Sequence, residues 1–430
     1  MNIRKVVILG GNGKMGRNVG GVFASFGEAE VYLVARKYDD AKLAVEKAAK
    51  SLRSSTVTAR IVPKTYEDLN EIIPTCDLVF ESVAENLFIK QKVYEQVGSF
   101  LNETTIIATG TSGLSINKLS RFLPEKLQKN YLGLHFFNPP YQLPFCEIIP
   151  CKKTRSELVT EMFDYSTEEL KRATIFSKDQ PAFVGNRIGF QFLNYLLQKC
   201  EEYSNYGGID YIDAIFSGYT GRGMAPAVTV DFVGLDVHKA IVDNVYANVP
   251  TDYVKDTFVV PSFVNELIEL GQRGIKDNGG LYKYIEGESF VYDIHQKIYR
   301  PLRGYELKNS HEIVCLFRDG LYQEGITKLL MEDSIETNLI IECLIMYSVY
   351  AINIAKTVGQ NIISADIAMA KGFNWLPPLN IVELFGGKDQ FITLAKERLG
   401  TELIDAMKIE SALKNAKPPQ FDYRRFLWAK

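Results

Sequence analysis

One histidine and one glutamate near the middle of the chain have the residue types and spacing of a catalytic acid–base pair. His135 is one of four histidines and ends an apolar run, and Glu147 follows twelve residues later, beyond the segment NPPYQLP. The spacing predicts a strand ending at His135, a turn locked by prolines, and a return strand carrying Glu147. An imidazole can take a proton from an alcohol near neutral pH, and a carboxylate on its far nitrogen fixes the tautomer and stabilises the imidazolium. Such a pair is more often structural, so further evidence must come from the rest of the chain.

A glycine motif near the N-terminus has the spacing of a dinucleotide-binding loop. The run KVVIL precedes Gly11, Gly13 and Gly16, which stand in the pattern G-x-G-x-x-G. We expect Gly11 to make the tight turn, Gly13 to leave space for the phosphates, and Gly16 to allow close packing of helix on strand. A plausible helix over 15–26 and a second apolar run at 31–35 complete a βαβ unit. This context favours a dinucleotide site over an ordinary glycine-rich turn.

The order of the expected elements predicts a two-part architecture. Strands and helices alternate up to about residue 180, as a parallel doubly wound sheet requires, and the pattern is helical from 182 onward. A chain of 430 residues also exceeds the usual size of a single core. We therefore expect an α/β Rossmann-type domain followed by two all-α helical domains. The boundaries would give a dinucleotide-binding domain at 1–181, a helical domain at 182–290, and a linker with a second helical domain at 291–430.

Composition argues against several other classes of protein. The net charge is −3, and there is no basic stripe interleaved with aromatic residues, so we expect no nucleic-acid partner. The six cysteines are scattered without a C-x-x-C pair, which favours reduced thiols, a cytoplasmic location and no metal site. The N-terminal run leads straight into a core strand, which predicts no signal peptide. The apolar stretch 339–355 is interrupted by Glu342, Ser348 and Asn353, and we expect a buried core helix rather than a membrane span.

Eight segments in order resemble the 3-hydroxyacyl-CoA dehydrogenase family. They are GNGKMG at 11–16, ESVAENLFIK at 81–90, ATGTSGLS at 108–115, HFFNP at 135–139, Glu147, PAFVGNR at 181–187, PAVTVDFVGLD at 226–236 and ELGQRGIKDNGGLYKY at 269–284. The resemblance implies an L-3-hydroxyacyl-CoA dehydrogenase of fatty-acid β-oxidation or a related pathway. His135 would be the general base, oriented by Glu147, and Ser112 and Asn186 would hold the C3 oxygen and the acyl carbonyl of the substrate.

Two of these implied roles have plainer alternatives. Ser112 is the kind of small hydroxyl that often caps a helix, here one that begins near Leu114. Asn186 stands where a long helix begins, so it could be only a polar residue of a helix start, although an amide with several donors and acceptors also suits a carbonyl.

The resemblance also implies a set of cofactor contacts. Glu85 and Lys90 follow a strand and would lie near the nicotinamide and its ribose; their alternative is a solvated first helical turn. The full set of implied cofactor residues is Gly11, Gly13, Met15, Gly16, Arg36, Glu85, Lys90 and Ser112.

Two positions depart from the family pattern. Where an acidic residue is expected to bind the ribose hydroxyls, this chain has Ala35, followed by Arg36 and Lys37. Loss of the carboxylate removes repulsion against a 2′-phosphate, and Arg36 could pair with that phosphate, so NADP is a candidate beside the family's usual NAD. The second departure is Gly110, where the family commonly has Asn, and it puts the strength of the activity in doubt.

The substrate and the assembly are less well defined. A basic helix face is a candidate contact for the CoA phosphates, although such faces are usually just solvated; it comprises Lys42, Lys47, Lys50 and Arg53. Two other functions remain open: a dehydrogenase of a free 3-hydroxy acid or sugar acid, and a non-catalytic cofactor-binding structural protein. The segment 364–387 weakly repeats 211–236, which resembles the duplicated helical half of multifunctional fatty-acid oxidation enzymes, here without an enoyl-CoA hydratase domain. A monomer built on this pseudo-dimeric repeat is expected, with a homodimer as the alternative.

Overall fold

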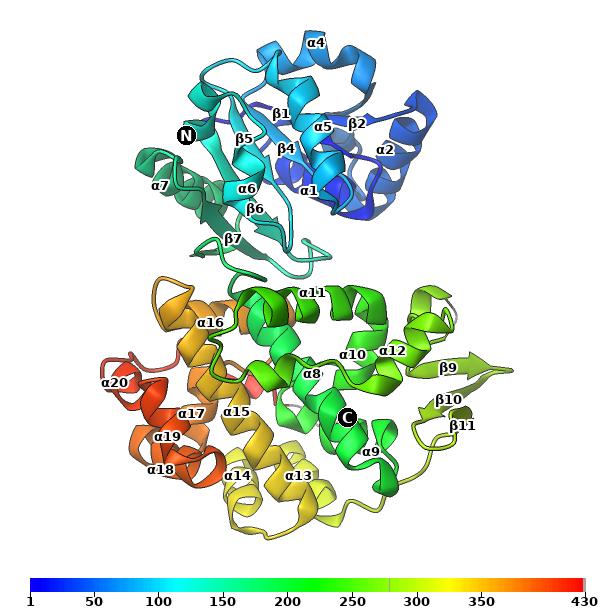
Figure 1. Cartoon of the computed structure of the whole chain (residues 1–430), viewed down its shortest axis with the longest axis vertical. Helices are drawn as coiled ribbons and strands as arrows, with labels where there is room; N and C mark the ends of the chain where they lie inside the picture. Colours follow the sequence, from blue (N-terminus) through cyan, green and yellow to red (C-terminus); the bar gives the residue numbers. More distant parts are fainter. Residues whose placement is uncertain (278, 428–430) are drawn as a thin grey trace. The chain divides into compact units, whose positions relative to one another are not determined.

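The chain forms two compact units, described here from a computed structural model that covers residues 1–277 and 279–427 (Figure 1). The first unit contains Met1–Phe183 and the short segment Val358–Gln360, and the second contains the remaining residues from Val184 onward. The first boundary lies two residues from the expected one. The expected division of the helical part near residue 290 stays a prediction.

An eight-stranded sheet forms the centre of the first unit, with the strand order β3-β2-β1-β4-β5-β6-β7-β8. Neighbouring strands are parallel except for β6 and β7, which are antiparallel. The predicted doubly wound α/β fold is therefore confirmed. The strands are β1 (Lys5–Leu9), β2 (Glu30–Ala35), β3 (Ile61–Thr65), β4 (Leu78–Glu81), β5 (Ile106–Thr109), β6 (Tyr131–Phe136), β7 (Phe145–Pro150) and β8 (Ala173–Phe176).

Helices cover both faces of this sheet, which explains why its central strands are apolar at nearly every position. In β1, Val6 and Ile8 belong to one buried cluster, and Val7 and Leu9 belong to another on the opposite face. The first cluster is completed by α1 (Lys14–Ser25), α2 (Tyr38–Leu52) and α7 (Ser156–Asp164). The second is completed by α4 (Leu69–Ile72), α5 (Leu87–Gly98) and α6 (Ile116–Ser120). A short helix, α3 (Ser55–Thr58), follows α2.

A segment from late in the sequence belongs to the first unit. The backbone N–H of Lys178 donates to the carbonyl of Val358 at 2.8 Å, and Ser177 pairs with Gly359 in an antiparallel bridge. Residues 358–360 thereby continue the hydrogen bonding just beyond β8.

The second unit is mainly helical. Its longest helix, α15 (Ile335–Thr357), is long and apolar enough to cross a membrane by length and composition, but 89% of its most apolar window is buried within the structure. This agrees with the expected core helix. The others are α8 (Gly185–Glu202), α9 (Ile209–Ile215), α10 (Pro226–Val233), α11 (Leu235–Asn248), α12 (Ser262–Glu269), α13 (Lys308–Arg318), α14 (Tyr322–Met331), α16 (Ile363–Ala368), α17 (Pro378–Leu384), α18 (Gly387–Leu399), α19 (Thr401–Ala406) and α20 (Ile409–Lys414).

The second unit also contains a small sheet that we did not predict. The strands β9 (Tyr282–Ile285), β10 (Glu288–Asp293) and β11 (Ile298–Pro301) pair antiparallel in the order β11-β10-β9. Glu286 and Gly287, with φ of 52° and 93°, make the two-residue turn between β9 and β10. The expectation that this part of the chain is all-α, with a linker from residue 291, was wrong because a two-residue turn between short aromatic runs was not recognised as a hairpin.

Candidate active site

His135 and Glu147 form a buried pair at the antiparallel junction of the sheet. The register of β6 and β7 places His135 directly opposite Glu147. The imidazole Nδ1 lies 2.7 Å from the Glu147 Oε2, and the exposed fractions of the two residues are 3% and 0%. The predicted strand–turn–strand arrangement is thus present, and the proline segment between the strands folds into a turn in which the Leu143 N–H donates to the Pro139 carbonyl at 2.9 Å.

This pairing fixes the tautomer of the histidine. A carboxylate accepts only, so Nδ1 carries the proton and Nε2 of the neutral ring keeps a free lone pair. Nε2 lies 3.1 Å from the Ser112 Oγ, whose hydroxyl can donate to it. The ring is flanked by the side chains of Phe137 and Phe183, with centroid distances of 5.0 and 5.5 Å. The arrangement is that of a base with one oriented nitrogen and one nitrogen that would accept from a substrate hydroxyl in place of Ser112.

Ser112 lies in the loop after β5, and it does not cap the helix that follows. The N-cap of α6 is Ser115, whose Oγ accepts from the Lys118 N–H at 3.2 Å. Asp179 adds acceptors for the N–H groups of Ile116 and Asn117, both at 2.9 Å. The capping alternative for Ser112 is therefore wrong, and its hydroxyl is left to face His135.

Glu85 and Lys90 connect this loop to the interior of the sheet. The Glu85 Oε1 accepts from the hydroxyl of Thr111 and from the N–H groups of Ser112 and Gly113 at 3.0 and 3.1 Å. The Lys90 ammonium is 1% exposed and contacts the Glu85 Oε2 at 3.3 Å. A solvated first helical turn is thus wrong for Lys90, while the expected contacts of both residues with a cofactor stay a prediction.

Lys90 is held by a buried glutamate that we did not single out from the sequence. Glu81 ends β4, and its two oxygens accept from the Lys90 ammonium at 2.7 and 2.9 Å. It also accepts from the Tyr94 and Thr109 hydroxyls at 3.1 and 2.8 Å, and from the Val83 N–H at 2.7 Å. A carboxylate at the end of an otherwise apolar strand, nine residues before a lysine, was the available signal.

The glycine loop shows which glycine does which task. Gly11 lies in the tight turn, which the Gly13 N–H closes by donating to the Gly10 carbonyl at 3.0 Å, and the positive φ of 74° falls on Gly10. A Cβ on Gly11 would lie 2.9 Å from the Cα of Leu33 in β2, and a Cβ on Gly16 would lie 2.7 Å from the Gly10 carbonyl oxygen. A Cβ on Gly13 would meet only that same oxygen at 3.3 Å and the Ser82 oxygen at 4.0 Å. Gly13, the N-cap of α1, is therefore less closely surrounded than Gly11 or Gly16.

A cavity of about 610 Å³ lies beside this loop, at the carboxyl ends of β1 to β4. Gly10, Asn12 and Gly13 form one wall, and Arg36, Tyr66 and Glu67 form another; Ser82, Val83, Ala84, Ile89, Val93 and Gln96 complete it. A helix N-terminus with an exposed glycine suits a pyrophosphate, and Arg36 lies in the same cavity. The residues present therefore fit a dinucleotide. Met15 is partly buried and packs against the core beneath the loop.

Asn186 and Gly110 complete the set of residues singled out from the sequence. Asn186 belongs to the second unit, where it is the second residue of α8 and is 7% exposed. Gly110 lies directly after β5, where a Cβ would come within 2.7 Å of the Phe80 Cζ. The core ring of Phe80 thus occupies the space that a side chain at position 110 would need.

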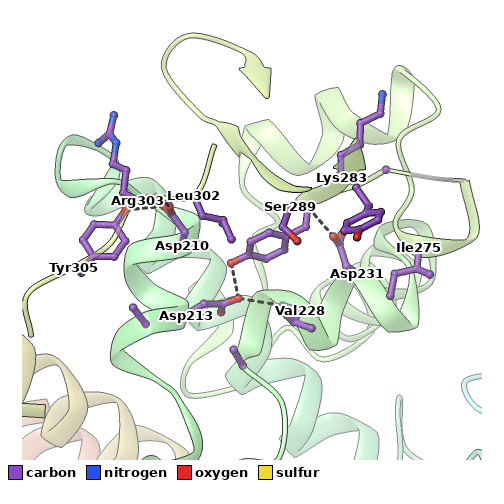
Figure 2. A pocket seen from close by; sticks show the side chains of 15 residues that line it. Asp210, Asp213, Val228, Asp231, Ile275, Lys283, Ser289, Leu302, Arg303 and Tyr305 are labelled. Atoms are coloured by element: carbon purple, nitrogen blue, oxygen red, sulfur yellow. Dashed lines mark hydrogen bonds between the residues drawn. The ribbon is translucent and has the colours of Figure 1, made fainter. Parts of the chain in front are cut away.

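The second unit has a cavity of about 970 Å³ of its own, lined in part by three aspartates (Figure 2). Burial raises the pKa of Asp213 to about 7 and that of Asp231 to about 6. Asp213 accepts from the N–H groups that begin α10 and from the Tyr282 hydroxyl, and Asp231 accepts from the N–H groups of Leu281 and Tyr282 at 2.7 Å. Asp210 is paired with both Nη atoms of Arg300. These carboxylates hold backbone and side chains in place. No cluster of metal-ligating side chains occurs among the described residues.

Comparison with known proteins shows that the chain belongs to one family, two models of which together match residues 5–284 except 181 and 182. The 3-hydroxyacyl-CoA dehydrogenase NAD-binding domain matches residues 5–180, and the C-terminal domain of the same family matches residues 183–284. A probable 3-hydroxyacyl-CoA dehydrogenase of Caenorhabditis elegans is 30% identical over 56% of this chain and 75% of its own length. One of Bacillus subtilis is 29% identical over 84% of this chain and 45% of its own length.

A solved structure resembles nearly the whole chain. The 3-hydroxybutyryl-CoA dehydrogenase of Escherichia coli aligns with 96% of this chain and 99% of its own, at a TM-score of 0.70 and 18% identity, which supports the fold. The chain spans about half the length of several curated relatives that it matches.

Proposed function

Because the chain belongs to the 3-hydroxyacyl-CoA dehydrogenase family, we propose that it is itself such a dehydrogenase, reversibly oxidising the 3-hydroxyl of an acyl-CoA to a 3-oxo group with NAD(P). The observation that carries the proposal is the line of contacts from Glu147 through His135 to Ser112. It presents one basic nitrogen, of fixed tautomer, beside a hydroxyl that can hold an oxygen atom.

The proposed reaction uses this nitrogen as the base. The hydroxyl proton of the substrate passes to His135 Nε2, the C3–H bond breaks, and C3 and its oxygen become a carbonyl. A bound nicotinamide dinucleotide would supply the acceptor of the hydride that leaves C3. The imidazolium is stabilised by the Glu147 carboxylate at Nδ1, and in the reducing direction it returns the proton to the C3 oxygen. Ser112 would hold that oxygen, and Asn186 the acyl carbonyl.

The loop Gly10–Gly13 and the N-terminus of α1 would bind the pyrophosphate of the cofactor. For the choice between NAD and NADP we propose that NADP is accepted, because Arg36 stands in the cavity at the end of β2, which ends with Ala35 and not with an acidic residue; Glu67 is the acid of this cavity and comes from the segment after β3. Its guanidinium can pair with a 2′-phosphate.

The substrate is proposed to be the CoA ester and not the free acid. The exposed face of α2 presents Lys42, Lys47 and Lys50, and Arg53 is its C-cap. These cations suit the phosphates of CoA, and a free 3-hydroxy acid would not use them. The line of contacts at His135 is intact, which speaks against a non-catalytic structural role.

We further propose that the helical unit is a duplicated element and that the chain is a monomer. Asp213 accepts from the N–H of Ala227 in α10 at 2.8 Å, and Asp366 accepts from that of Leu379 in α17 at 3.0 Å. Each of these helices begins with a proline and is followed by a glycine of positive φ, directly in α10 and after one further residue in α17. The two stretches share one core, because the Arg222 guanidinium lies over the rings of Phe192, Tyr347 and Trp375, at 4.1 to 5.2 Å. Light scattering at twice the chain mass would contradict the monomer.

The test of the activity is absorbance at the reduced-nicotinamide band during reduction of acetoacetyl-CoA. Parallel reactions use free acetoacetate, and each substrate is run with NADH and with NADPH. We expect turnover of the CoA ester that collapses in His135→Ala and persists in His295→Ala, a control at an exposed histidine of the second unit. A protein that binds reduced cofactor and turns over neither substrate would contradict the proposal.

A further inference from the structure

Glu85 gathers three hydrogen-bond donors from three consecutive residues onto one carboxylate oxygen. The Thr111 hydroxyl and the N–H groups of Ser112 and Gly113 all point to its Oε1. The same loop carries the Ser112 Oγ that lies 3.1 Å from His135 Nε2. The carboxylate thus fixes the backbone of the residue whose side chain meets the base.

The other oxygen of Glu85 is tied to the interior of the sheet. Its Oε2 lies 3.3 Å from the Lys90 ammonium, which is itself held by both oxygens of the fully buried Glu81. Glu81 is in turn bonded by the Tyr94 and Thr109 hydroxyls. A lysine that is 1% exposed and bonded at three oxygens has little freedom to move. The position of the Glu85 carboxylate is therefore fixed, through Lys90, by Glu81 at the end of β4.

The charge on Glu85 suits this task. Burial works to raise the pKa of its carboxyl, but the positive charge of Lys90 and the hydrogen bonds from Thr111 and Ser112 outweigh burial, and the pKa lies below its usual value. The ionised group can accept from all three donors at once, as charge-assisted hydrogen bonds to a carboxylate allow.

We propose that Glu85 is a positioning residue which, anchored through Lys90 on Glu81, holds the 111–113 loop so that the Ser112 hydroxyl stays within hydrogen-bond distance of His135. The inference rests on the proposed function, because it assigns Glu85 an effect on the reaction at His135. It differs from the cofactor contact expected for Glu85 from the sequence. Loss of Glu85 should therefore lower kcat for acetoacetyl-CoA at saturating reduced cofactor, where a change in cofactor affinity cannot account for the loss.

The experiment is a double-mutant cycle of Glu85→Ala and Ser112→Ala, with kcat and KM for acetoacetyl-CoA and fluorescence titration of NADH as readouts. If Glu85 acts through Ser112, Glu85→Ala should lower kcat by about tenfold or more in the wild-type background and by less than about twofold in the Ser112→Ala background. Glu85→Gln keeps an acceptor oxygen but loses the charge, and we expect it to fall between wild type and Glu85→Ala. It also keeps the test available if the alanine variant does not fold. Glu95→Gln, on the exposed side of α5, is the matched control and should leave kcat unchanged.

The outcomes separate this inference from the proposed function. Multiplicative losses of kcat in the double variant, or a weaker NADH affinity that accounts for the loss, would overturn the positioning role while the activity stands. A wild type that turns over no acetoacetyl-CoA would overturn the proposed function, and the inference with it.

Discussion

His135 and Glu147 are direct cross-strand neighbours, and their contact is set by the register of β6 against β7. Residues directly opposite one another in an antiparallel pair have their side chains on the same face, and a slip of one residue would turn one of the two away. The pair is therefore fixed by backbone hydrogen bonds on both sides, and substitutions of the carboxylate can be interpreted as changes of charge rather than of position.

Glu147→Gln should lower kcat for acetoacetyl-CoA by about ten- to a hundredfold. The amide oxygen can still accept from Nδ1–H, but it supplies no negative charge to the imidazolium that forms at His135. Because Glu147 lies at the sheet interior, the affinity for NADH should not change, and fluorescence titration would check this. An unchanged kcat in a folded variant would show that the carboxylate has only a structural role.

Gly13→Ala and Gly16→Ala should separate cofactor binding from stability. The new Cβ of Gly13→Ala would lie 3.3 Å from the Gly10 oxygen, a close contact that a small shift relieves, but it would stand where the pyrophosphate approaches, so NADH affinity should fall by about tenfold or more. In Gly16→Ala the Cβ would lie 2.7 Å from that oxygen. Backbone must then shift at a cost of about 1–3 kcal/mol, more than the 0.5–1 kcal/mol or so that alanine gains over glycine in a helix. Both predictions are checked by thermal unfolding and NADH titration of the two variants. Equal melting temperatures of Gly13→Ala and Gly16→Ala would contradict the predicted difference in stability.

Gly110→Asn, which restores the residue common in the family, should destabilise this protein and not activate it. The Phe80 Cζ would lie 2.7 Å from the new Cβ, and Phe80 is a fully buried core residue packed against Phe23 and Phe136. Overpacking of this kind costs about 1–3 kcal/mol. Gly110→Ala should show most of the same loss in chemical denaturation. If Gly110→Asn is as stable as wild type and has a raised kcat, the Phe80 ring must move to make space for the new side chain, and the prediction is wrong.

Asp366→Asn should stabilise the protein more at pH 8 than at pH 5. Asp366 is 1% exposed, and burial raises its pKa from 3.8 to about 7, although the Leu379 N–H acts in the opposite direction. Because the folded state then binds the proton more tightly than the unfolded state, the stability that this carboxyl contributes is full below about pH 4 and is lost as pH rises to about 7. The amide does not titrate. The difference in free energy of unfolding between the variant and the wild type should therefore grow between about pH 4 and pH 7, by at most roughly 4 kcal/mol. Denaturation at the two pH values measures it, with Asp389→Asn on the exposed side of α18 as the control; a difference that does not depend on pH would contradict the assignment.

Features that depend on residue type over a continuous segment, such as the buried strands and the proline turn, could be predicted from the sequence. The alternation of strands and helices up to residue 180 gave the sheet, because strands covered on both faces must be apolar throughout, as β1 is. The turn between His135 and Glu147 was predictable because its prolines exclude continued strand. The positive φ at Gly10 could not be predicted, because either of the adjacent glycines, Gly10 and Gly11, could adopt it, and only the close approach of β2 to Gly11 distinguishes them.

The support behind Ser112 could not be predicted from local pattern. Lys90 stands in a helix where a lysine is ordinarily solvated, and its burial depends on Glu81, a residue of a different element. Similarly, the lack of a side chain at Gly110 has its cause in Phe80, thirty residues earlier in the sequence. Both relationships are tertiary: the first depends on the packing of α5 against β4, and the second on the pairing of β4 with β5.

The return of residues 358–360 to β8 makes the first unit discontinuous in the sequence. A gene fragment that ends at Phe183 would remove the Val358 carbonyl that accepts from the Lys178 N–H, and with it the bridge between Ser177 and Gly359. The two units therefore cannot be exchanged between relatives as two contiguous segments of sequence. A chimera would have to carry three junctions, and an insertion near residue 359 would act on the edge of a sheet whose other strands all lie before residue 177.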